Sequence, residues 1–108
     1  MTLSGIRTII SEISTFQNKV TYRAWPVGKA PKLPFVCYLA TDTDNFDADN
    51  HVWKVIQNVD VELYTEKKSP SVEQKLEAAF DANFIPWDKT ETWLEDEQCY
   101  EILYEISI

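Results

Sequence analysis

The chain has 108 residues, which suffice for one domain with a single modest core and are too few for two. Hydrophobic residues make up 44% of the chain and aromatic residues 13%, so the composition excludes a disordered protein. Only two glycines occur, which argues against a phosphate-binding loop, and no apolar run reaches the roughly 18 residues of a membrane span.

The first 41 residues predict one helix and two strands. Apolar side chains recur at three- and four-residue spacing over residues 3–17, which is typical of an amphipathic helix. Alternation over residues 20–25 predicts a short strand. A connector with three prolines follows, and it cannot join a central sheet ladder. Residues 35–41 are apolar on both faces and predict a central strand.

Residues 42–50 form the one segment of unusual composition, with four aspartates and two asparagines in nine positions. Asp and Asn side chains compete for backbone hydrogen bonds, so we expect an exposed loop here. Residues 52–65 then alternate and predict one long, half-buried antiparallel strand.

The last third predicts a helix and a hairpin. Ser69-Pro70 is a typical helix start, and the apolar stripe that follows runs to Asn83. Residues 89–94 and 99–108 predict two strands joined by a turn. The whole chain, 1–108, is therefore expected to be a single α+β domain with the order αβββαββ. Its antiparallel sheet would have four to five strands, with two helices packed on one face.

Charge is divided unevenly along the chain. Residues 1–41 carry five basic residues and one acid, whereas residues 42–108 carry five basic residues and seventeen acids. The net charge is −8, and the acidic surface opposes non-specific binding to nucleic acid. We expect no specific nucleic-acid binding either. A basic patch and an acidic patch on one subunit would suit head-to-tail packing, and a chance asymmetry on a soluble acidic domain is the alternative.

Residue chemistry indicates no catalytic centre. The Asp-rich segment suggests calcium, but Phe46 stands where a third ligand belongs and Trp53 where an EF-hand places its closing glutamate. His51 has no cysteine or histidine at zinc-like spacing. Nucleophilic catalysis would need Cys37 or Cys99 beside His51, and nothing in the spacing places them together. The apolar neighbours of Cys37 favour a buried thiol. We therefore expect no enzyme activity, no cofactor and no catalytic or metal-binding residue.

Contacts with partners are expected at two places. Arg23 and Trp25 lie close together, and both residue types are frequent binding hot spots. The acidic segment offers the second candidate interface, with four carboxylates: Asp42, Asp44, Asp47 and Asp49.

The element order and the phrases Val61-Glu62-Leu63-Tyr64-Thr65 and Ser69-Pro70 resemble a known family. The chain is similar to the small tail-terminator, or tail-completion, proteins of long-tailed bacteriophages and prophages. The resemblance implies an α+β subunit that self-associates into a hexameric ring, caps the finished tail tube and joins it to the head. It implies a location in the virion tail, and in the host bacterial cytoplasm during assembly. It implies no enzyme activity and no cofactor.

Two other interpretations remain open from the sequence. Phage head–tail connector proteins of similar size share the pattern. An acidic interaction module, such as a DNA-mimic inhibitor of a nucleic-acid enzyme, would also account for the charge, and it predicts acids spread over one continuous surface.

Overall fold

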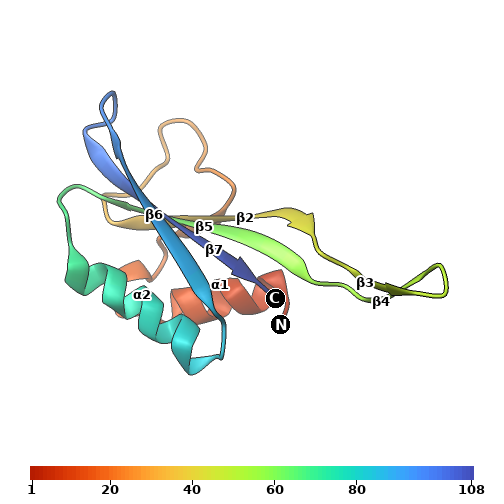
Figure 1. Cartoon of the computed structure of the whole chain (residues 1–108). Helices are drawn as coiled ribbons and strands as arrows, with labels where there is room; N and C mark the ends of the chain where they lie inside the picture. The colour runs from red at the N-terminus through yellow and green to blue at the C-terminus, as the bar shows by residue number, and fades with distance from the viewer.

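The computed structural model describes the whole chain, residues 1–108, and its strands form one large sheet and one separate ribbon (Figure 1). The large sheet has five strands in the order β1-β2-β5-β7-β6, and the ribbon pairs β3 with β4. The elements in chain order are α1 (Leu3–Ser11), a 3₁₀ turn (Ser14–Phe16), β1 (Val20–Tyr22), β2 (Phe35–Thr43), β3 (Phe46–Ala48), β4 (His51–Lys54), β5 (Gln57–Thr65), α2 (Pro70–Ala82), β6 (Trp87–Leu94) and β7 (Cys99–Ser107).

Both helices lie on the same side of the five-stranded sheet (Figure 1). Thr2 caps α1, because its hydroxyl accepts a hydrogen bond from the Gly5 backbone N–H. Pro70 occupies the start of α2, where its missing N–H costs nothing. No helix of the chain has the length and apolar character that a membrane crossing requires.

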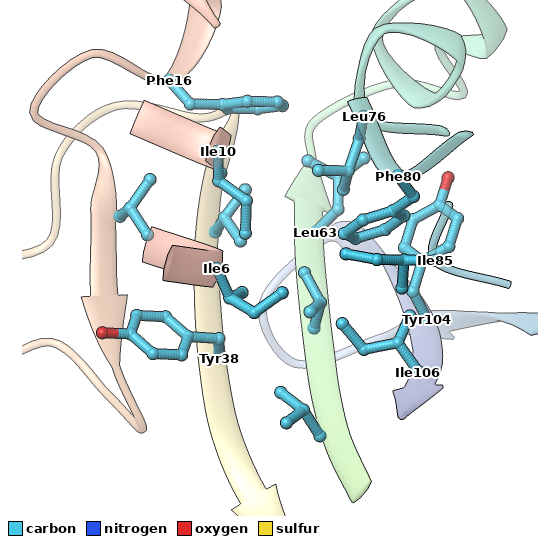
Figure 2. Close-up of a cluster of buried hydrophobic side chains, with 14 of the residues drawn as sticks. Ile6, Ile10, Phe16, Tyr38, Leu63, Leu76, Phe80, Ile85, Tyr104 and Ile106 are labelled. Carbon is cyan, nitrogen blue, oxygen red and sulfur yellow. The ribbon is translucent and has the colours of Figure 1, made fainter. Parts of the chain in front are cut away.

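The core fills the space between the helices and the inner face of the sheet. Figure 2 shows Ile6, Ile10 and Phe16 on one side of this space, facing Leu76 and Phe80. The sheet contributes alternate residues of its three central strands: Val36 and Tyr38, Val59, Val61 and Leu63, and Ile102, Tyr104 and Ile106. The predicted α+β class is confirmed, and so is the inward row of β7.

The sheet is mixed, so the prediction of an antiparallel sheet is wrong at one edge. β1 pairs with β2 in parallel, with Val20 opposite Val36. The chain leaves β1 at Arg23, whose positive φ of 69° turns it into the connector, residues 23–34. This connector returns the chain to the end of the sheet where β1 began, so both strands run in one direction. β2, β5, β7 and β6 are antiparallel.

The Asp-rich segment is not a loop, and residues 52–65 are not one strand. β2 continues to Thr43, and residues 46–48 pair with residues 51–54 as a hairpin. The alternation of apolar and polar residues continues through residue 55, but the structure divides this segment into two strands with different partners. β4 pairs with β3, whereas β5 pairs with β2. The element order therefore contains two strands more than predicted.

The first predicted helix also ends early. Ile13 takes an extended backbone conformation, with φ −73° and ψ 120°, and the 3₁₀ turn after it buries Phe16 completely. The apolar spacing continued to residue 16 because Phe16 packs in the same core as α1, although it is not in the same helix.

Candidate interaction surfaces

The ribbon formed by β3 and β4 projects from one end of the molecule, and we call residues 44–55 the arm (Figure 1). Asp49 and Asn50 make its two-residue turn, and both have positive φ, 52° and 62°. Asp and Asn tolerate this conformation better than other non-glycine residues, and such turns match the twist of a hairpin. The composition that predicted a loop thus encodes a hairpin tip.

The arm exposes large apolar side chains on both of its faces. Val52 pairs opposite Asp47 and Phe46 pairs opposite Lys54. Because the neighbours Phe46 and Asp47 point to opposite faces of their strand, Phe46 and Val52 lie on opposite faces of the arm. Trp53 is 71% exposed, and Phe46, Val52 and Val55 are each more than half exposed. A two-stranded hairpin is marginally stable alone in water, so an arm with apolar side chains on both faces is suited to contact with a partner.

The base of the arm is fixed by hydrogen bonds to the sheet. The Asn58 side-chain amide donates to Asp42 Oδ1 at 3.0 Å and to Asp44 Oδ2 at 2.7 Å. The Asp44 backbone N–H donates to the Ile56 carbonyl at 2.9 Å, which continues the antiparallel ladder to the start of the arm. These contacts hold the two strands together where they leave the sheet.

The face of the five-stranded sheet opposite the helices, here called the open face, is acidic. Asp60 on β5 lies opposite Glu105 on β7, and Glu105 lies opposite Asp88 on β6. These three acids line a concave region of about 350 Å³ with Asp42 and Asp44. The open-face positions of β5, β6 and β7 include no lysine or arginine, so no cation offsets the carboxylates.

Burial and like charge raise several pKa values on this face. Burial raises the pKa of Asp60, and the carboxylates of Glu62 and Asp42 raise it further. Burial and Glu62 raise the pKa of Glu101. Burial raises the pKa of the Cys37 thiol to about 11, helped by Glu62 and Glu101, so Cys37 stays protonated and unreactive at neutral pH.

At the end of the open face away from the arm, the connector lines one side of a broad, open aromatic pocket of about 440 Å³. Seven of its nine lining residues are hydrophobic. Trp25 and Phe35 meet edge to face at 5.9 Å between ring centroids, and Phe35 and Tyr64 are 5.2 Å apart. The indole N–H of Trp25 is buried and has no acceptor in the chain.

The helix-covered face carries the ion pairs. Glu73, only 1% exposed, accepts hydrogen bonds from Lys68 at 2.7 Å and from Lys89 at 3.0 Å. Lys89 also binds Glu77 at 2.8 Å, and the Tyr104 hydroxyl donates to Glu77 at 2.6 Å. This network joins α2 to the sheet. The acids of the open face, by contrast, form no ion pair.

The six residues predicted for interfaces fall into three places. Arg23 and Trp25 line the aromatic pocket, Asp42 and Asp44 stand at the base of the arm, and Asp47 and Asp49 lie in the arm itself. Sequence reasoning missed the exposed apolar residues of the arm, because Trp53 and Val55 continued a core-like alternation. It also missed the acidic row, which only strand register brings together.

No three histidine, cysteine or acidic side chains are positioned to hold a metal ion together. A scan against protein-family models and a search of curated proteins each gave no match to this chain.

Proposed function

We propose that this protein is a structural subunit of a long-tailed bacteriophage or prophage. In this role it forms a ring that caps the finished tail tube and joins it to the head. It acts without catalysis and without a cofactor. The resemblance of the sequence to tail-terminator proteins indicates which assembly the subunit belongs to. The arm gives a physical reason to expect that the subunit assembles.

The arm is the observation that carries the proposal. Its four large apolar side chains project beyond the sheet, and its strands pair only with each other. Exposed apolar area of this kind is removed from water by a partner, which stabilises both the arm and the assembly.

The acidic open face supports the same role in a second way. A ring that lets DNA pass from head to tail benefits from a surface that repels the phosphate backbone, because DNA then does not adhere to it. The row Asp60, Glu105 and Asp88 supplies such a surface without any compensating cation.

Deletion of the gene from the phage or prophage that encodes it tests this function. We expect electron micrographs of the lysate to show filled heads separated from tails, with tails of irregular length. Tails of uniform length, still separated from heads, would point instead to a head–tail connector. Normal infectious particles would contradict a role in the virion.

An acidic interaction module is the second candidate, and the continuity of the acidic face favours it. A DNA mimic presents carboxylates in place of phosphates and binds a basic enzyme tightly at low salt. Pull-down of host nucleases or polymerases by the purified chain, released by 0.5 M salt and lost in a Glu105→Lys variant, would support it. Intact virion assembly in the deletion strain would be required as well.

A further inference from the structure

We infer that the arm of one subunit docks in the aromatic pocket of the next copy, beside the basic connector, with Trp53 as the anchor. This inference rests on the proposed self-assembly and specifies which two surfaces meet. It assigns a binding partner to the pocket, namely a second copy of this chain.

The arm and the pocket lie at opposite ends of β2, so one chain cannot make this contact with itself. Phe35, at the first position of β2, lines the pocket, and Thr43, at its last, leads into the arm. At about 3.3 Å per residue the strand separates them by roughly 26 Å. The molecule is elongated, 50 × 28 × 23 Å, and the arm points away from the sheet (Figure 1).

The pocket matches the arm in chemistry and size. Phe35, Tyr64 and Leu94 form apolar walls, and Ala30 leaves room at the rim. The pocket has a volume of about 440 Å³ and is broadly open to solvent, so an indole ring can reach its apolar walls.

Charge is complementary between the arm and the connector side of the pocket, whereas the opposite wall of the pocket carries the acid Glu97. The connector carries Arg23, Lys29 and Lys32 and no acid, and all three of these side chains are exposed. The arm carries Asp44, Asp47 and Asp49 against one lysine, Lys54. Opposite charges around an apolar anchor fix orientation and speed association.

A contact between two different patches is heterologous, and repetition of it generates a ring if the rotation closes. Each subunit then gives one arm and receives one arm. An arm-to-arm contact, by contrast, would pair subunits two by two and stop there. The geometry therefore supplies the kind of interface that a ring-forming subunit needs.

The test uses two full-length variants, one that lacks the anchor on the arm and one whose pocket is blocked. Trp53→Ala removes the anchor, and Ala30→Trp fills the pocket; both positions are exposed, so circular dichroism and thermal melting should match the unmodified chain. Light scattering during size exclusion should show each variant associating at least tenfold more weakly. An equimolar mixture should yield a 1:1 heterodimer, because one intact arm still meets one intact pocket.

Phe84→Gly is the matched control, since it removes another exposed aromatic at the far end of α2 and should leave assembly unchanged. If the variants assemble as the unmodified chain does, or if the mixture yields no heterodimer, the docking inference is wrong while self-assembly stands. If Phe84→Gly weakens assembly as much as Trp53→Ala, the effect is general loss of apolar surface, and the inference also fails. An unmodified chain that stays monomeric removes the proposed self-assembly as well.

Discussion

Asp60 lies directly opposite Glu105 across the β5–β7 ladder, on a face where no lysine or arginine stands beside either carboxylate. Like charges directly opposite each other in a sheet destabilise it. The pKa of Asp60 is raised by burial and by the neighbouring acids Glu62 and Asp42. This face therefore retains charge at a cost to folding stability, as a surface used in recognition or repulsion would.

Asp60→Asn should stabilise the fold at pH 7 by about 0.5 kcal/mol, because it removes a charge that the folded state disfavours. A raised pKa means that the folded state binds its proton more tightly than the unfolded state does. Stability of the unmodified chain therefore rises as pH falls through the raised pKa, and the advantage of the variant should vanish there. Urea unfolding at pH 7 and at pH 4 measures this. Asp96→Asn, in the exposed β6–β7 turn, should show no such gain; a loss of stability in Asp60→Asn at pH 7 would contradict the account.

Glu73→Gln should destabilise the fold by about 2 kcal/mol, because it leaves the hydrogen bonds from Lys68 and Lys89 without a charged acceptor. Burial acts to raise the pKa of Glu73, but the two lysines outweigh it and hold this pKa below its usual value. The stabilisation is therefore present above the unfolded-state pKa and is lost as pH falls through the folded-state pKa. Denaturation at pH 7 and at pH 3 should show the difference shrinking in acid. Glu66→Gln, on the exposed turn, serves as control, and equal effects of the two substitutions would refute the role of Glu73.

Phe84→Gly should raise stability by about 1 kcal/mol. Phe84 has a φ of 57°, follows the end of α2, and is 93% exposed. The Ile85 N–H donates to the Phe80 carbonyl and the Phe84 N–H to the Asp81 carbonyl, which is the Schellman arrangement that favours glycine at this position. Thermal unfolding of the variant and of the unmodified chain measures this gain in stability. Asn83→Gly, one residue earlier at negative φ, should lower stability instead, and the opposite order of the two variants would contradict this interpretation.

Charge reversal should separate the electrostatic part of the docking contact from the apolar part. Asp47→Lys on the arm and Lys32→Glu on the connector should each weaken association several-fold at low salt, and the double variant should recover part of the loss. Sedimentation at 50 mM and 500 mM salt measures this, with the differences shrinking at high salt. Lys75→Glu, which lies on α2, is the control and should have no effect. Equal behaviour of the single and double variants would show that these two charges do not meet.

The sequence predicted most of the elements because their signals are local. The Ser69-Pro70 helix start, the alternation of β7 and the apolar stripe of α1 each depend on neighbours only a few residues away. The two lone cysteines were also expected to be buried, and both are. Where an element is determined by residues close together in the chain, hydrophobic periodicity and capping residues are sufficient to predict it.

The strand arrangements that the sequence missed all depend on long-range pairing. Alternation through Trp53 and Val55 is the same whether a strand lies in a sheet or in a projecting ribbon, so periodicity could not separate β4 from β5. The parallel pairing of β1 with β2 is decided by the path of the connector. The acidic row of Asp60, Glu105 and Asp88 joins three strands whose register no local pattern encodes.

The signal for the arm was present in Asp49-Asn50, the kind of dipeptide that suits a two-residue hairpin turn. It was obscured because the surrounding aspartates indicated a loop. An Asp-rich strand is disfavoured inside a sheet, but both strands of the arm have water on either side, so its carboxylates remain solvated.

The most direct test of self-assembly removes the arm without disturbing the sheet. The Asp44 N–H already pairs with the Ile56 carbonyl, so deletion of residues 46–54 together with Val55→Gly leaves Asn-Gly as a two-residue turn between paired positions. We measure the mass of both proteins by light scattering over a range of concentrations. The account predicts one discrete oligomer for the full chain and a folded, equally stable monomer for the armless variant. A monomeric full chain, or an armless variant that still forms the same oligomer, would contradict it.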